Sequence, residues 1–221
     1  LTLGASVYTV GTNQLKYMKV YELMEDEELT FAAMPPSLLQ FLSPYFDEIH
    51  VPKLKYLIVT AEAANADLLQ RFRGCAPNAE FVNLYGPTEA TIYCTAYRIP
   101  PENCKQHNGM IAIGRPFSGL ETIIMDEKGM PVAEGEQGEL WVSGEQVMRG
   151  YWQDEDKSRQ VFARFNGKEY YKTGDLCSVD SDGDIIYRGR KDYQVKVQGF
   201  RVELSEIEYR TKKFFPNETH A

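Results

Sequence analysis

Over the first 95 or so residues, apolar positions alternate between helical spacing and short continuous runs. Residues 13–24 carry apolar side chains at helical intervals, and 29–34 form a short apolar run. Residues 35–42 open with two prolines, which suit the first turn of a helix. The pattern therefore predicts alternating helix-like and strand-like segments in this part of the chain.

The clearest unit in this region is a strand, a helix and a second strand. The run 54–60 is typical of a buried strand, 65–72 has helical spacing, and 79–86 is another strand. This order and spacing predict parallel βαβ pairing. Ligands of such sheets gather beyond the carboxyl ends of the strands, and "NLYGPTE" (83–89) falls at such an end.

From about residue 97 to 190 the pattern changes to short strands separated by Gly, Asp and Pro. Such punctuation indicates hairpins, and hence a small β-rich subdomain or distorted barrel. "DSDGD" (180–184) resembles a calcium loop, but its glycine is misplaced and Lys191 stands where a bidentate glutamate is needed. We expect a tight turn there. The predicted strands lie within 120–132, 138–144, 169–175 and 182–189.

After Lys191 the pattern predicts a β-hairpin and then a helix, with Ser205 and Glu208 as a capping box. The expected fold class is α/β. Its parts are a parallel βαβ-type subdomain (1–96), a β-rich distorted-barrel subdomain (97–191), and a hinge with the start of a small α+β C-terminal domain (192–221).

Composition narrows the possible partners. The net charge is −8 and the pI is near 5.0, which argues against a broad nucleic-acid or anionic-membrane surface. The four cysteines form no CxxC pair and the three histidines are scattered, so neither a zinc site nor a disulfide framework is indicated. No apolar run approaches the length of a membrane span, and the first residues do not resemble a signal peptide, so we expect a cytoplasmic protein.

A strand that ends in Gly-Pro and then presents Thr88 and Glu89 together needs more than a surface turn to explain it. Three further motifs accompany it: "GELWVSGEQVMRGYW" (138–152), "YKTGDL" (171–176) and "GRKDYQVKVQGFRVELSEIE" (189–208). Each alone has a plain structural explanation, such as a hairpin. Together and in this order they resemble the core motifs of the adenylate-forming superfamily. This superfamily includes acyl-CoA synthetases, luciferases and the amino-acid adenylation domains of peptide synthetases.

Within the superfamily, details favour the amino-acid branch. The turn reads YGPTE, and "RVELSEIE" lacks the proline that acyl-CoA synthetases typically have near Leu204 or Ser205. "NLYGPTEAT" and "IIMDEKGMPV" are similar to D-alanine:carrier-protein ligases, although stand-alone adenylation domains share most of these features. Two alternatives stay open: an acyl-CoA synthetase for a fatty or aromatic acid, and a non-catalytic interaction module.

The resemblance implies an ATP site with Mg²⁺. Glu89 would help to hold Mg²⁺ and Thr88 would lie beside the α-phosphate, so these are the candidate catalytic residues. Gly86 and Pro87 would fix the turn that aims them. The resemblance places Tyr85 against adenine and Asn83 at its exocyclic amine. Asp175 would accept from the ribose hydroxyls, Tyr187 would form another side of the site, and Arg190 would contact ribose or phosphate.

Other positions follow from the same resemblance. Asp192 matches the hinge, and Gly199 the loop that faces the thiol channel. The implied partners are a small amino acid and the phosphopantetheine thiol of a carrier protein. We interpret Arg149, Gly150 and Tyr151 as structural rather than catalytic. The residues expected to border the amino-acid side chain are Thr60, Leu84, Ile92 and Tyr93.

Three parts of the family's machinery have no counterpart among the 221 residues. These are the glycine-rich Ser/Thr loop for the pyrophosphate end of ATP, the aspartate for the substrate amine, and the catalytic lysine. We therefore expect a fragment that lacks the N-terminal half and most of the C-terminal domain, and that does not adenylate on its own.

Overall fold

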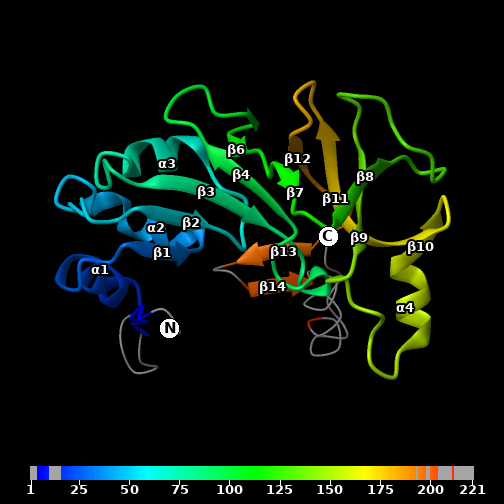
Figure 1. Cartoon of the computed structure of the whole chain (residues 1–221), viewed down its shortest axis with the longest axis horizontal. Helices are drawn as coiled ribbons and strands as arrows, with labels where there is room; N and C mark the ends of the chain where they lie inside the picture. Colours follow the sequence, from blue (N-terminus) through cyan, green and yellow to red (C-terminus); the bar gives the residue numbers. More distant parts are fainter. Residues whose placement is uncertain (1–3, 10–15, 193, 198–199, 204–210, 212–221) are drawn as a thin grey trace.

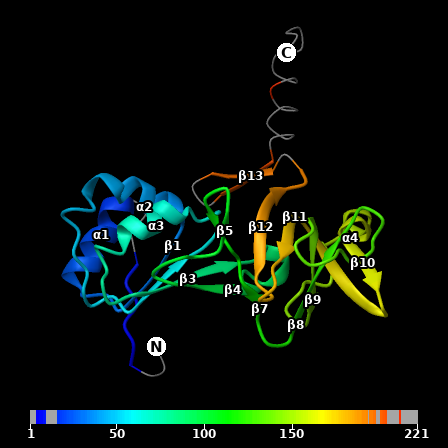
Figure 2. The ribbon, with the colours of Figure 1, turned by 90° about the horizontal axis from the view of Figure 1, so that it is seen from above.

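Two β-sheets lie side by side in the computed structural model, which describes residues 4–9, 16–192, 194–197, 200–203 and 211 (Figure 1). The first sheet carries three helices, and in the view from above they gather on one side of its strands (Figure 2). The second sheet holds the later strands, and a two-stranded hairpin lies below the junction in Figure 1. The helices of the first part are α1 (Lys16–Asp26), α2 (Pro36–Leu42) and α3 (Ala66–Phe72), with the 3-10 turn η1 (Ser43–Tyr45).

The first sheet has the order β1-β2-β3-β4-β7. Pairing is parallel between β1 and β2 and between β2 and β3, as the sequence pattern predicts, and antiparallel from β3 onward. The sheet therefore continues through β4, across residue 96, where the sequence places the end of the first subdomain. The strands are β1 (Phe31–Met34), β2 (Tyr56–Val59), β3 (Glu80–Tyr85), β4 (Thr95–Ile99) and β7 (Arg115–Pro116).

Local chemistry explains where the helices begin. The Asn65 side chain accepts a hydrogen bond of 3.1 Å from the Leu68 N–H and caps α3, while Pro36 begins α2 directly after Pro35. Helices α2 and α3 each bury apolar side chains in one core. In the resulting core, the ring of Phe72 lies 5.2 Å from that of Phe46 and 6.2 Å from that of Phe81.

The second sheet is antiparallel throughout and curved, which confirms the β-rich part of the predicted fold class. Its order is β10-β11-β9-β8, with β12 also paired to β11. The register of β11 against β9 shifts between Lys172 and Leu176, so β11 bends there. The strands are β8 (Leu120–Met125), β9 (Gly138–Gly144), β10 (Phe162–Phe165), β11 (Lys168–Val179) and β12 (Ile185–Arg190).

Smaller elements complete the described chain. The hairpin of β13 (Gln194–Val197) and β14 (Phe200–Glu203) confirms the predicted hairpin, whereas Ser205, Glu208 and Gly199 lie outside the described residues. A short helix, α4 (Glu155–Val161), follows an Asp154 cap. β5 (Gln106–His107) and β6 (Met110–Ile111) form a short ladder, and η2 (Thr88–Ala90) is a 3-10 turn.

The expected tight turn at 180–184 is present between β11 and β12. The Gly183 N–H donates to the Asp180 carbonyl at 2.9 Å. Lys105 Nζ lies 2.7, 2.7 and 2.6 Å from carboxylate oxygens of Asp180, Asp182 and Asp184. The ammonium group of the protein itself thus occupies the position that a cation would take among these carboxylates. Among the helices described, none has the length and apolarity needed to span a membrane.

Candidate active site

The chain turns back on itself directly after β3, and this reversal requires glycine at position 86. The Cys94 N–H donates to the Tyr85 carbonyl at 2.8 Å, which closes the reversal. A Cβ on Gly86 would lie 2.5 Å from the Ile92 carbonyl oxygen and 2.8 Å from the Cys94 nitrogen. Both are backbone atoms, so they cannot move aside as a side chain could. Only glycine therefore fits without displacing the turn.

The residues after η2 hold a strained backbone. Thr91 and Ile92 have φ values of 54° and 72°, and Ile92 is 59% exposed. Such angles are rare for β-branched residues, and strain of this kind gathers at functional sites. Gln146 Nε2 donates to the carbonyls of Ala90 (2.7 Å) and Tyr93 (2.6 Å), and Thr91 Oγ1 donates to the Gln146 carbonyl at 2.6 Å. Gln146, which follows β9, thus stabilises the strained turn through three hydrogen bonds.

Thr88 and Glu89 are adjacent in sequence but differ in exposure. Thr88 is exposed, whereas Glu89 is buried. The Tyr151 hydroxyl donates to Glu89 Oε1 at 2.7 Å, and the Met148 N–H donates to the Glu89 backbone carbonyl at 2.7 Å. The Thr88 hydroxyl and the Glu89 carboxylate are thus neighbours on the same turn. The carboxylate is buried and accepts a hydrogen bond, whereas Thr88 is exposed.

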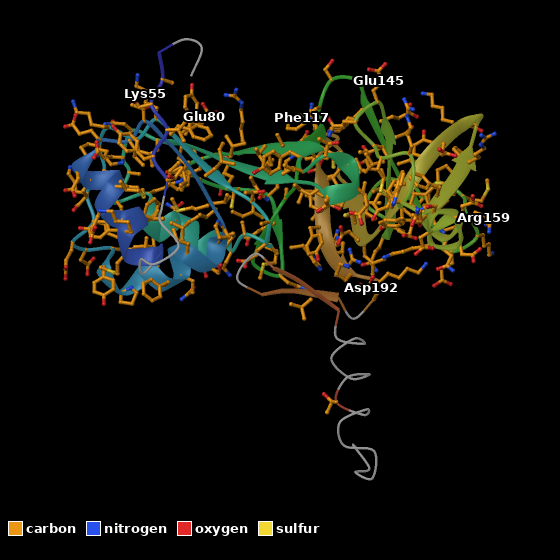
Figure 3. All side chains as sticks on the ribbon, turned by 90° about the horizontal axis from the view of Figure 1, so that it is seen from below. Lys55, Glu80, Phe117, Glu145, Arg159 and Asp192 are labelled. Atoms are coloured by element: carbon orange, nitrogen blue, oxygen red, sulfur yellow. The ribbon has the colours of Figure 1, made fainter. Side chains whose placement is uncertain are left out.

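Asp175 connects the two sheets. The Tyr85 hydroxyl, at the end of β3, donates to Asp175 Oδ2, although the two residues are 90 positions apart. Arg190 Nη1 donates to Asp175 Oδ1 at 3.0 Å, while Arg190 Nε and Nη2 donate to Asp192 Oδ1 and Oδ2 at 2.9 and 2.5 Å. The Arg190 guanidinium therefore connects Asp175, which is predicted to bind ribose, with Asp192, which is predicted to be the hinge. Figure 3 shows Asp192 where β12 ends and the β13–β14 hairpin begins.

The bend in β11 presents Asp175 to this cluster. Thr173 Oγ1 donates to the Leu140 carbonyl at 2.8 Å and accepts from the Asp175 N–H at 3.0 Å. Gly174 takes a φ of 73°, and its N–H donates to Glu139 Oε1 at 3.0 Å. The Thr-Gly pair of "YKTGD" is therefore the local reason why Asp175 leaves the regular ladder and faces β3.

Burial sets the protonation states around Asp175. Burial, with the charge of Asp175 adding to it, raises the pKa of the Tyr85 and Tyr187 hydroxyls, and the same two causes raise the pKa of the Cys94 thiol to about 12. Burial lowers the pKa of Arg190, but the carboxylates of Asp192 and Asp175 outweigh this and raise it. The phenols and the thiol are therefore neutral at physiological pH, and the Asp175 charge is balanced by the guanidinium.

Asn83 and Tyr187 complete the predicted nucleotide set. Asn83 Nδ2 donates to the Ala112 carbonyl at 2.9 Å, and the side-chain carbonyl oxygen is the atom able to accept from an amine. Strand alternation puts Asn83 on the same face of β3 as Tyr85. Tyr187 is half-buried and packs against the apolar cluster that contains Tyr85.

Of the residues predicted for the amino-acid pocket, Thr60 and Leu84 lie at the ends of β2 and β3. The other two, Ile92 and Tyr93, lie between η2 and β4. Val59 pairs with Asn83, so Thr60 and Leu84 come at the same level of the sheet. Leu84 lies on the opposite face from Asn83 and Tyr85. Tyr93 is half-buried, and Ile92 lies in the strained turn. A groove of about 400 Å³ lies elsewhere, between β8, residues 131–134 and the β11–β12 turn, and no residue predicted for the site lines it.

Four residues that contact the predicted site residues or the strained turn were not assigned to the site from the sequence. Gln146, Thr173 and Glu139 carried no assigned role, and Tyr151 was interpreted as structural only. Thr173 had a detectable signal, because a hydroxyl two residues before an aspartate often accepts its N–H. The contacts of Gln146 and Tyr151 span more than 50 residues and have no local signature.

The carboxylate of Glu89 fits a hard divalent cation. Carboxylate oxygens are the ligand type that Mg²⁺ prefers, and one oxygen of Glu89 accepts from the Tyr151 hydroxyl. Asp175 is held by an arginine and a tyrosine instead, so a metal would be bound near Glu89 rather than near Asp175.

The chain is similar in sequence to known proteins over most of its length. Novobiocin biosynthesis protein H of Streptomyces niveus is 37% identical over 211 residues, which are 94% of this chain and 33% of the relative. The D-alanine–D-alanyl carrier protein ligase of Streptococcus pneumoniae is 34% identical over 216 residues, or 96% of this chain and 42% of the ligase.

Among solved structures, the Vibrio cholerae adenylation domain AlmE, in complex with glycyl-adenosine-5′-phosphate, superposes with a TM-score of 0.81. It is 29% identical, and the match covers 90% of this chain and 38% of AlmE. The chain thus spans between a third and about two fifths of the length of these three proteins. The family model described as AMP-binding enzyme matches residues 1–152, more than half of the chain. The chain therefore belongs to the AMP-binding enzyme family.

Proposed function

We propose that the protein containing this chain binds ATP and joins a carboxylic acid to AMP. The observation that carries the proposal is the cluster of Tyr85, Asp175 and Arg190 at the carboxyl end of β3. An ionised carboxylate can accept from two neighbouring hydroxyls, which suits the 2′,3′-diol of ribose, so we assign Asp175 to the ribose hydroxyls. Tyr85 and Tyr187 would border the base, and Asn83 Oδ1 would accept from the adenine amine.

The same turn would serve the phosphates. Thr88 is exposed beside the buried Glu89, so its hydroxyl can donate to an α-phosphate oxygen. Glu89 would hold Mg²⁺, which when bound supplies positive charge opposite the phosphate oxygens. In the reaction, a carboxylate oxygen of the acid bonds to the α-phosphorus as the bond to the bridging oxygen breaks, and pyrophosphate leaves. Arg190 would contact ribose or phosphate from the other side.

We propose that the acid is a small amino acid, D-alanine or one of similar size. The name of the Streptococcus pneumoniae relative and the glycyl-adenylate in the AlmE complex support this choice. Thr60, Leu84, Ile92 and Tyr93 would border the amino-acid side chain. In the second step a carrier-protein phosphopantetheine thiol would lose its proton and attack the acyl carbon, and AMP would leave. Asp192 would be the hinge between the two steps, and Gly199 would lie on the loop that faces the thiol.

The test uses the full-length gene product in an ATP–pyrophosphate exchange assay across D-alanine, L-alanine, glycine, larger amino acids, and fatty and aromatic acids. We expect exchange with a small amino acid. Asp175→Asn should lower kcat/KM for ATP by about 10- to 100-fold, the cost of losing charge-assisted bonds to the ribose. The matched control is Glu169→Gln, which also removes the charge of a carboxylate close to an arginine, Arg164 at 3.9 Å, but at an exposed position on strands β10 and β11.

Other outcomes separate the alternatives. Exchange supported only by fatty or aromatic acids would favour an acyl-CoA synthetase. Failure of the wild-type protein to bind ATP would favour a non-catalytic interaction module. Equal loss of activity in Asp175→Asn and Glu169→Gln would remove Asp175 from the nucleotide site.

A further inference from the structure

Packing only partly explains the Arg-Gly-Tyr sequence at residues 149–151. Tyr151 is half-buried, and its hydroxyl lies 2.7 Å from Oε1 of Glu89, 62 residues away in sequence. Glu89 itself stands on a three-residue 3-10 turn, which fixes the backbone but not a side chain with three rotatable bonds. Something else must set the direction of that carboxylate.

We propose that Tyr151 is a positioning residue that orients the Glu89 carboxylate for a divalent cation. The inference rests on the proposed function, since it concerns the metal that would accompany ATP. A phenol suits the task because it donates one hydrogen bond and leaves the carboxylate ionised. A lysine or arginine in its place would neutralise the charge that attracts the cation.

The chain around Tyr151 is built to hold this side chain still. The Tyr151 N–H donates to Ser158 Oγ at 2.8 Å, and Ser158 Oγ donates in turn to the Asp154 carbonyl at 2.7 Å. Lys157 Nζ lies 4.4 Å from the centre of the Tyr151 ring, a cation–π distance. The tyrosine is thus held at its backbone and at its ring, and its hydroxyl is directed to Glu89.

Helix α4 lies against β10 and β11 without burying a side chain. It has seven residues and no buried side chain, so it contributes little to a core. Two of its residues, Lys157 and Ser158, contact Tyr151. We infer that α4 serves as a clamp for Tyr151, and through it for Glu89.

The experiment compares the full-length wild-type protein with Tyr151→Phe, which keeps the ring and removes only the hydroxyl. The probe is Mn²⁺ with α,β-methylene-ATP, and free Mn²⁺ is measured by electron paramagnetic resonance. We expect the affinity for Mn²⁺ to fall about 10-fold, as is usual when a partner that orients a metal ligand is lost. Affinity for the nucleotide without metal should stay the same.

The matched control is Tyr170→Phe. The Tyr170 hydroxyl also donates to a glutamate carboxylate, Glu121 Oε1 at 2.5 Å, but on strands β8 and β11 outside the site. This variant should bind Mn²⁺ like the wild type. If Tyr151→Phe does too, the inference is overturned while the proposed function stands. If the wild type shows no metal-dependent binding of the ATP analogue, the proposed function itself fails.

A second variant decides the matter if Tyr151→Phe does not fold. Ser158→Ala keeps the hydroxyl of Tyr151 and removes the side chain that accepts from its backbone N–H. We expect a smaller loss of Mn²⁺ affinity, about 3-fold, because the hydroxyl remains but is less well held. Unchanged affinity in this variant would also overturn the inference.

Discussion

At the scale of single residues, backbone geometry explains the most specific part of the turn. Gly86 has no room for a Cβ because the Ile92 carbonyl and the Cys94 nitrogen occupy that space. The following proline confines φ, so the chain enters η2 in one direction. These two residues place Thr88 and Glu89 through their backbone geometry.

We therefore expect Gly86→Ala to destabilise the fold. The added methyl group must displace backbone on both sides, which should cost about 3 kcal/mol of unfolding free energy. Urea denaturation followed by circular dichroism measures this. Gly74→Ala is the control, because the atom nearest to a Cβ there is a carbonyl oxygen at 3.6 Å and the residue is exposed. Equal midpoints for the two variants would contradict the steric argument.

Residues of the candidate site could be identified from the sequence only where they belong to a recognisable motif. Tyr85, Asp175, Arg190 and Asp192 form one connected cluster, and all four were named from their motifs. Gln146 has no such marker, because its amide reaches the strained turn only through the fold. Its role depends on where β9 ends relative to β3, which no local pattern encodes.

At the scale of elements, strongly patterned segments were predictable and weakly patterned ones were not. The buried strands β2 and β3 and the capped helix α3 follow from apolar runs and an Asn cap. Helix α4 was missed because it has no apolar face, and it depends on its Asp154 cap and on Tyr151. The short strand β4 has only a weak sequence signal, because its burial alternates over only five residues.

The β11–β12 turn is an element stabilised by charge. Lys105 holds three carboxylates that would otherwise repel one another, so Lys105→Met should lower the unfolding midpoint at pH 7. Lys53→Met, an exposed lysine outside this turn, is the control. Thermal unfolding by calorimetry measures both, and equal midpoints would mean that the cluster contributes nothing measurable.

The same variant has a defined pH dependence. Burial acts to raise the pKa of Asp180, but the hydrogen bond from Lys105 and neighbouring N–H groups lower it below 3.8, its ordinary value. A lowered folded-state pKa gives stability that is complete above the unfolded-state value and is lost as pH falls through the folded-state value. The difference between Lys105→Met and wild type should therefore be constant from pH 5 to pH 8, as estimated from these pKa values, and shrink below about pH 4. A gap that widens in acid would contradict this assignment.

At the scale of the whole molecule, the site exists because two sheets meet. Tyr85, Ala90 and Cys94 from the end of the first sheet share an apolar cluster with Leu140 and Cys177 of the second. Sequence patterns predicted both sheets but not how they pack together. The packing depends on the bend in β11, and the sequence signal for that bend is the Thr-Gly pair of "YKTGD".

The Arg190 side chain connects this junction to the chain at Asp192. Arg190 donates to Asp175 in β11 and to both oxygens of Asp192, and the Lys191 N–H donates to the Gly174 carbonyl at 2.9 Å. Asp175 is buried and Asp192 is half exposed at its side chain, so the first contact is less screened by solvent than the second. We therefore expect the contact between Arg190 and Asp175 to contribute to holding the start of the β13–β14 hairpin.

Arg190→Met should accordingly loosen this connection without unfolding either sheet. We expect the Lys191 amide to exchange with solvent about 10-fold faster, as estimated from the loss of a charge-assisted contact, while amides in β8 and β9 keep their wild-type rates. Hydrogen exchange followed by mass spectrometry resolves the two regions. Arg188→Met is the control, because Arg188 lies on the same strand but contacts Ser178 and His107 instead. Faster exchange at Lys191 in the control as well would mean that β12 as a whole, rather than Arg190, holds the connection.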